Sequence, residues 1–163
     1  MEPVDFVKMV WDEQNATGFV FVSVKQDTWY DVAFSWKKNK GGEVEIPNVD
    51  GDLYFCPNVF SGPKRRKELM LPSIWLYADL DDVDPEYVDP RPTTAWESSP
   101  NRFQCLWRMT QKCQPQEHSE LNQRLTYAIG ADKGGWDRTQ VLRIPGTINH
   151  KYPLRPKVKL LWT

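Results

Sequence analysis

The sequence predicts an α+β fold with a mainly antiparallel sheet. Short runs of apolar, aromatic and β-branched residues recur along the chain, and two segments have helical periodicity. Strands and helices are interleaved without a strict βαβ order. With 163 residues and 40% hydrophobic content, the chain can bury one substantial core. We therefore expect one domain that spans residues 1–163.

The first half of the chain begins with a helix and continues with strands. Val4, Val7, Val10 and Trp11 recur near helical spacing, which predicts a short amphipathic N-terminal helix. Aromatic and β-branched residues then predict three strands, with breaks at the Gly41-Gly42 pair and at Pro57. These three strand segments are residues 18–25, 28–44 and 51–60.

The second half contains the most apolar strand, residues 73–81, and a predicted hairpin about residues 99–101. A helix is expected over 115–130, because Pro115 suits its start, Leu121, Leu125 and Ile129 recur at its spacing, and Gly130 suits its end. The segment from 131 to 152 has little periodicity, and a last strand is expected near residues 157–163. We expect the helices to lie on one face of the sheet.

Composition limits the function classes. The chain has 21 Lys+Arg and 22 Asp+Glu, so any surface that attracts nucleic acid must be local. The three cysteines form no C-x-x-C pair, and an odd number argues against a disulfide framework. No segment approaches the roughly 20 apolar residues of a membrane helix. We expect a cytoplasmic protein that does not enter the membrane.

The strand over 73–81 ends in a group of carboxylates. Side chains alternate along a strand, so Asp79 and Asp81 point the same way with Cα atoms about 6.6 Å apart. Two such carboxylates can share Mg²⁺ or Mn²⁺ and leave positions open for phosphates. The alternative is a solvated acidic turn. A calcium-binding loop does not fit, because Val83 falls on a ligand position when the loop is counted from Asp79. Asp82 and Asp84 suit turn and capping positions.

Two later segments offer groups for anions. Ser98 and Ser99 stand in a turn, and Arg102 and Gln104 share one face of the next strand. Arginine matches phosphate geometry, and serine turns donate hydrogen bonds to anions. The alternative is an ordinary polar strand face. The last cluster surrounds the Pro145-Gly146 turn and contains Asp137, Arg143, Asn149 and Lys151.

These clusters resemble the motifs of the archaeo-eukaryotic primase superfamily in order and spacing. An apolar strand that ends in D-L-D is followed by S-S-P-x-R-F-Q and then by D-x5-R-I-P-G-T-x-N-x-K. The chain looks most like the primase-polymerase branch of plasmids, phages and other mobile elements. The motifs span roughly residues 75–151, and the segment 54–67 is also similar to this branch.

The resemblance implies an RRM-like catalytic core with an N-terminal α/β unit beside it. It implies that Asp79, Asp81 and Asp137 hold Mg²⁺ or Mn²⁺, with Asp132 as a competitor for the third position. Gln104 stands where many members carry a histidine that contacts the nucleotide. An amide can still donate or accept a hydrogen bond, but it carries no charge.

The activity that the resemblance implies is template-directed nucleotide addition during replication of a mobile element. We expect a nucleoside triphosphate to contact Ser99, Arg102, Gln104, Arg143, Asn149 and Lys151. The basic segment Lys64, Arg65, Arg66 and Lys67 is a candidate for contact with template and primer DNA, with a solvated charge run as the alternative. Trp136 is a candidate to stack on a base. Two alternatives are a metal-dependent nuclease and a non-catalytic DNA-binding module.

The resemblance also implies a helical or helicase region downstream in the same protein. Because relatives of this branch use such a region to hold template and initiating nucleotide, we expect residues 1–163 to extend primers more readily than they start them.

Overall fold

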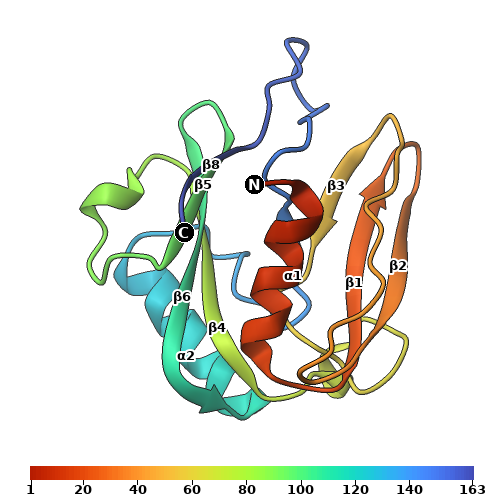
Figure 1. Cartoon of the computed structure of the whole chain (residues 1–163). Coiled ribbons are helices and arrows are strands. Elements are labelled where there is room, and N and C mark those ends of the chain that lie inside the picture. The colour runs from red at the N-terminus through yellow and green to blue at the C-terminus, as the bar shows by residue number, and fades with distance from the viewer.

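Two antiparallel sheets with a helix between them form the body of the molecule (Figure 1). The computed structural model describes residues 1–163. The strand order is β2-β1-β3-β7 in the first sheet and β4-β6-β5-β8 in the second. The elements are α1 Pro3–Gln14, β1 Gly18–Lys25, β2 Trp29–Trp36, β3 Asp52–Phe55, β4 Ser73–Leu80, β5 Thr94–Ser99, β6 Arg102–Cys113, α2 Pro115–Ala128, β7 Leu142–Arg143 and β8 Lys159–Trp162. The predicted α+β class is confirmed.

Helix α1 joins the two sheets through its apolar side. Pro3 occupies the first turn, where its missing N–H leaves no hydrogen bond unmade. The fully buried Phe6 packs edge-to-face against Phe55 of the first sheet and Trp96 of the second, with centroid distances of 5.6 and 5.3 Å. Trp11 donates to the carbonyl of Cys56 at 2.8 Å. The main core therefore lies around α1 and draws on both sheets.

The predicted hairpin is β5 and β6, which pair antiparallel. Strand β6 also pairs with β4, in a register that sets Asp79 opposite Gln104 and Leu80 opposite Phe103. The carboxylates at the end of β4 therefore lie beside the start of β6. This register brings the first two sequence clusters together.

Strand β4 is the edge of the second sheet, and side chains from other elements cover that edge. Asn122 Oδ1 accepts from the backbone N–H of Tyr77 at 2.9 Å, and His118 Nε2 lies 2.7 Å from the carbonyl of Trp75. Gln14 of α1 accepts from the N–H of Ile74 at 2.8 Å. An edge strand with satisfied backbone groups cannot pair with another chain, and it is held in place.

The contacts of α2 differ from the sequence expectation. Its fully buried side chains are polar, namely His118, Asn122 and Thr126, and the first two bond to the β4 edge. Leu125 and Ile129 are only partly buried against the smaller core of the second sheet. The helices also do not share one face: α1 lies between the sheets, and α2 lies on the other side of the second sheet (Figure 1).

Two further findings bear on the expectations from composition. All three cysteines are free and buried, as the odd number indicated. Neither helix has the length and apolarity needed to cross a membrane.

Candidate nucleotide-binding cleft

A cleft of about 260 Å³ opens where β4 ends and β6 begins, and it extends to β3 and β7 of the first sheet. Both sheets and the loops that follow α2 and β7 contribute to it. Its lining residues are Tyr54, Asp79, Asp81, Ser98, Ser99, Arg102, Gln104, Asp132, Val141, Arg143, Lys151 and Tyr152. The structure thus gathers most members of the three sequence clusters in one place.

Asp79 and Asp81 enter the cleft from the end of β4. Burial raises the pKa of Asp79 to about 6; a hydrogen bond from Gln104 opposes this shift, and the charges of Asp81 and Asp132 add to it. Asp81 forms an ion pair with Arg102, with 2.7 Å between Nη1 and Oδ1. Asp79 is therefore a carboxylate crowded by negative charge in a poorly hydrated place, which a bound cation would relieve.

The third acidic residue in the cleft is Asp132. Its backbone N–H donates to the carbonyl of Asp79 at 2.8 Å, which fixes the loop after α2 against the end of β4. Gly135 helps this approach, because a Cβ there would lie 3.3 Å from the carbonyl oxygen of Asp132 and 3.5 Å from Asp79 Cβ. The motif resemblance offers Asp132 only as a competitor of Asp137 for the third ligand position.

Asp137, the expected third ligand, lies outside the cleft. Its carboxylate accepts from the backbone N–H and the hydroxyl of Thr139, at 2.9 and 3.0 Å. It faces a different hollow, lined also by Lys67, Ser119, Trp136 and Arg138. The structure therefore separates Asp137 from Asp79 and Asp81, contrary to the expectation from motif spacing, and it places Trp136 beside Asp137 in that hollow.

The backbone of the 136–139 loop explains this orientation. Four consecutive carbonyls accept hydrogen bonds from side chains of other elements: that of Trp136 from Asn122, that of Asp137 from Tyr77, that of Arg138 from Asn58 and that of Thr139 from Arg65. With its carbonyls held by the body of the protein, the loop presents the Asp137 carboxylate to solvent.

The buried side chain of Gln104 forms hydrogen bonds with three other strands at the cleft. Its Oε1 accepts from the backbone N–H of Arg143 at 2.9 Å and from Trp96 Nε1 at 3.1 Å. Its Nε2 lies 3.4 Å from Asp79 Oδ2. The amide thus already uses its oxygen within the protein, and only its NH₂ group faces Asp79.

Arg143 lines the cleft from β7, and Asp52 and Tyr54 fix its guanidinium group. Its Nη1 lies 2.9 Å from Asp52 Oδ1, and both side chains are nearly buried. Its guanidinium carbon lies 4.9 Å from the ring centroid of Tyr54. This packing fixes the direction of a cation that a flexible side chain would otherwise leave mobile.

The other predicted nucleotide contacts divide into two groups. Ser99, Arg102 and Lys151 line the cleft, and the last two are exposed. Asn149 does not line it: the side chain is 1% exposed, donates to the carbonyl of Ser98 at 2.8 Å and accepts from the N–H of Lys151 at 3.0 Å. Asn149 thereby joins the loop that carries Lys151 to the end of β5.

The basic segment lies on the surface, with one exception. Lys64, Arg66 and Lys67 are exposed, whereas Arg65 is partly buried. Arg65 pairs with Asp31 at 3.2 Å and donates to the carbonyl of Thr139. Arg65 therefore helps to fix the 136–139 loop.

Sequence reasoning missed three cleft residues and the partner of Arg143. Tyr54, Val141 and Tyr152 line the cleft but belong to none of the clusters. A hydrogen bond with Ser99 lowers the pKa of Tyr152. Asp52 precedes Tyr54 by two residues at the start of β3, and this alternation was the one sequence signal that could have placed both on one face.

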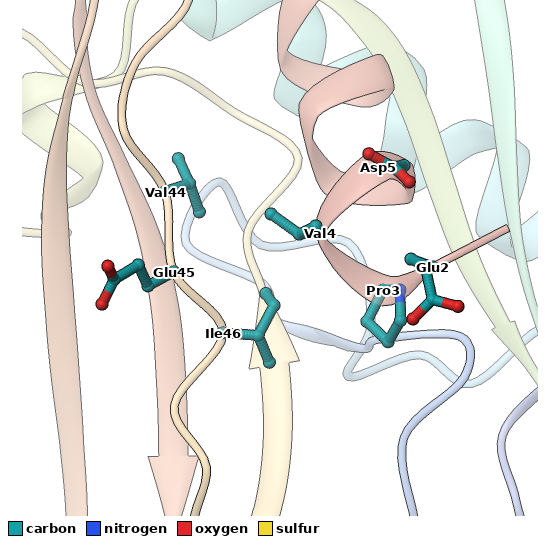
Figure 2. A pocket seen from close by; sticks show the side chains of 7 residues that line it. All are labelled: Glu2, Pro3, Val4, Asp5, Val44, Glu45 and Ile46. Carbon is teal, nitrogen blue, oxygen red and sulfur yellow. The ribbon is translucent and has the colours of Figure 1, made fainter.

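A larger hollow, of about 560 Å³, lies away from these residues, between the first turn of α1 and residues 44–46 (Figure 2). Its charged residues are Glu2, Asp5 and Glu45, and no cationic side chain lines it. It therefore does not suit phosphate or nucleic acid.

The chemistry of the cleft fits a hard divalent cation, although the side chains are not arranged around one. No group of three or more carboxylate, imidazole or thiolate side chains lies close enough to hold a metal ion. Asp79, Asp81 and Asp132 nevertheless supply carboxylate oxygens in one cleft, which are the ligands that Mg²⁺ and Mn²⁺ prefer. Asp81 is bonded to Arg102 in this conformation.

Comparison with known families identifies the family of the chain. Residues 66–161, more than half of the chain and all of the cleft except Tyr54, match the RepB DNA-primase N-terminal domain family. The chain belongs to this family. The resemblance to the primase-polymerases of mobile elements is thereby confirmed.

Solved structures share the fold of this RepB primase domain. The AEP domain of the primase-polymerase of cyanophage S-2L is 12% identical, with a TM-score of 0.72, over 98% of this chain and 88% of that one. Primase RepB′ is 15% identical, with a TM-score of 0.64, over 96% of this chain and 56% of that one.

A structure of the RepB′ catalytic domain in complex with initiator DNA is also similar, at 15% identity and a TM-score of 0.64, over 94% of this chain and 83% of that one. No curated protein sequence matches the chain significantly.

Proposed function

We propose that this RepB primase domain adds nucleotides to a growing strand on a single-stranded DNA template. In this reaction a 3′-hydroxyl attacks the α-phosphorus of a nucleoside triphosphate, a new phosphodiester bond forms and pyrophosphate leaves. The observation that carries the proposal is the composition of the cleft, in which three carboxylates from two segments face three cations. A nuclease has no need of a triphosphate site and hence of so many cations.

Arg102, Arg143 and Lys151 would bind the triphosphate. Arg143 suits this role best, because Asp52 and Tyr54 fix its guanidinium at the wall of the cleft. Ser99 would donate to a phosphate oxygen, and the NH₂ group of Gln104 would orient Asp79. Because these cations are in place before the nucleotide arrives, they need little reorganisation as charge moves to the pyrophosphate.

Asp79, Asp81 and Asp132 would hold Mg²⁺ or Mn²⁺. When bound, such a cation lowers the pKa of the attacking hydroxyl and offsets charge on the leaving group. We assign the third position to Asp132 because it lines the cleft and its backbone is bonded to Asp79. Arg102 would move from Asp81 to the triphosphate once the carboxylate has a cation to bind, because the pair is half exposed and held by a single short contact.

Template and primer DNA would contact the exposed cations of the basic segment. Lys64, Arg66 and Lys67 are free to meet phosphates. The similar RepB′ catalytic domain was solved in complex with initiator DNA, which supports a DNA partner. A helical or helicase region in the same protein stays an expectation.

Primer extension tests the proposal. A labelled primer annealed to a longer template is incubated with the protein, Mn²⁺ or Mg²⁺ and ribo- or deoxynucleoside triphosphates, with Asp79→Asn as the negative control. We expect the primer to lengthen with the wild-type protein only. Shortening of the primer would favour a nuclease. Unchanged primers, together with no rise in melting temperature on addition of triphosphate and Mn²⁺, would favour a non-catalytic DNA-binding module.

A further inference from the structure

The outer face of the first sheet carries an aromatic pair that belongs to no hydrophobic core. Trp29 begins β2 and Tyr54 lies on β3, and their ring centroids are 4.9 Å apart with 33° between the planes. Trp29 is 50% exposed. Neither ring belongs to a core cluster. An exposed tryptophan that rests on a second ring is a feature of binding surfaces.

Strand register places the pair next to the cleft. On β1, Val22 and Val24 face the α1 core, so Ser23 and Lys25 face outward. Lys25 pairs across the strands with Trp29, and Ser23 pairs with Tyr54. These side chains therefore share the outer face. Tyr54 also pairs with Arg143 on β7, so the row of Ser23, Tyr54 and Arg143 ends inside the cleft, and Trp29 with Lys25 forms the adjacent row.

Cations flank both rings. Lys25 Nζ lies 5.9 Å from the Trp29 ring centroid, and the guanidinium carbon of Arg143 lies 4.9 Å from the Tyr54 centroid. Lys25 stands on β1, between the strands that carry Trp29 and Tyr54, and Arg143 stands on β7 beyond Tyr54. The carboxylates of this face are paired with arginines, Asp31 with Arg65 and Asp52 with Arg143, so they offset little of the attraction for an anion.

We propose that Trp29 and Tyr54 form a stacking platform for a base of single-stranded nucleic acid that continues from the cleft across the first sheet. This inference rests on the proposed function, which brings such a strand to the cleft. Aromatic rings flanked by cations are how proteins bind single strands, since every base has a face to stack and every linkage a phosphate. Because Tyr54 also lines the cleft, a single strand bound there could extend onto the platform, which favours nucleic acid over a protein partner.

A binding measurement without triphosphate or metal separates the platform from catalysis. The anisotropy of a labelled single strand of about 15 nucleotides is followed as the whole chain is added. We expect Trp29→Ala and Trp29→Leu to weaken binding about 5- to 30-fold, and Trp29→Phe to retain most of the affinity, because stacking needs an aromatic face. Tyr30→Ala is the matched control: the residue is 42% exposed on the same strand but points to the other face, so affinity should stay within about 2-fold.

An abasic strand of the same length gives the decisive comparison. Wild type and Trp29→Ala should bind it alike, because it has phosphates but no base to stack. Equal affinity of both proteins for the normal strand would overturn the platform alone. So would an equal loss on normal and abasic strands, which would indicate a phosphate contact or misfolding. A wild-type protein that binds no single strand would overturn the DNA partner of the proposed function as well.

Discussion

The carboxylate of Asp52 lies 2.9 Å from the guanidinium of Arg143, in a pair whose side chains are only 8% and 10% exposed. Burial alone would raise the pKa of Asp52. Hydrogen bonds from the backbone of His150 and from Arg143 outweigh burial, so the pKa is lowered. Any anion that Arg143 binds in the cleft must therefore be bound while the arginine keeps its contact with Asp52.

We predict that Asp52→Asn destabilises the protein. Removal of one partner from a buried ion pair leaves the other charge uncompensated, which costs about 3–5 kcal/mol. For a chain of this size the melting temperature should fall by roughly 6–20 °C. The matched control is Asp50→Asn, because Asp50 is 76% exposed and pairs with the exposed Arg155. Exposed pairs contribute about 0–1 kcal/mol. Similar melting temperatures for the two variants would show that the Asp52 pair is not held as described.

We predict that Asp132→Asn abolishes nucleotide addition, whereas Asp137→Asn retains most of it. Asp132 lines the cleft with Asp79, whereas Asp137 is bonded to Thr139 outside it. Loss of a carboxylate that holds the cation should lower kcat about 100-fold or more, since the cation supplies several kcal/mol. Primer extension at saturating triphosphate measures both variants. A damaging Asp137→Asn and a mild Asp132→Asn would restore the assignment from motif spacing.

Much of the fold could be predicted from the sequence, because local patterns mark its strands. The helix after Pro3, the strand at 18–25 and the β5–β6 hairpin all lie where periodicity and turn residues predicted them. The arrangement of the helices was not predictable in this way. His118 and Asn122 are buried because β4 is an edge strand that needs hydrogen-bond partners, and a search for apolar periodicity overlooks a polar buried face.

Part of the candidate site could likewise be predicted from the sequence, and part could not. Strand alternation, which is readable in a sequence, sets Asp79 with Asp81 and Arg102 with Gln104. The register between β4 and β6, which are not consecutive strands, then brings the two pairs together. Asp132 and Asp137 lie in a loop of irregular backbone, where spacing says nothing about direction. The carbonyl contacts of the 136–139 loop decide which carboxylate enters the cleft, and these contacts come from residues as distant as Asn58 and Arg65.

We predict that Asp79→Ala or Asp81→Ala abolishes nucleotide addition without loss of the fold. Burial and the neighbouring carboxylates raise the pKa of Asp79, so its charge is unfavourable in the metal-free protein. Its removal should leave the melting temperature unchanged or higher when measured with EDTA. Primer extension should fall about 100-fold or more. A variant that keeps full activity would exclude that carboxylate from the reaction.

The cations of the cleft should act on substrate binding. Arg102→Ala and Lys151→Ala should raise the KM for the triphosphate more than they lower kcat, to the extent that they bind ground state and transition state alike. Arg108 provides a control of the same charge on β6, because it is exposed and pairs with Glu13 outside the cleft. Arg108→Ala should leave both constants unchanged. A calorimetric affinity for triphosphate that is equal in all three variants would contradict the cleft as the nucleotide site.

Acid should destabilise the protein through His118. Burial lowers the pKa of this histidine to about 4, and the charge of Arg138 adds to this effect, although a hydrogen bond to the Trp75 carbonyl opposes it. The unfolded chain, with a pKa near 6.5, takes up the proton first, so stability is full above about pH 6.5 and is lost as the pH falls toward 4. The loss between pH 7.5 and 4.5 should be roughly 2 kcal/mol. His118→Gln is neutral at both pH values and keeps an N–H that can reach the Trp75 carbonyl. Its urea midpoint should therefore depend less on pH than that of the wild type, and parallel curves for the two proteins would show that His118 does not titrate on unfolding.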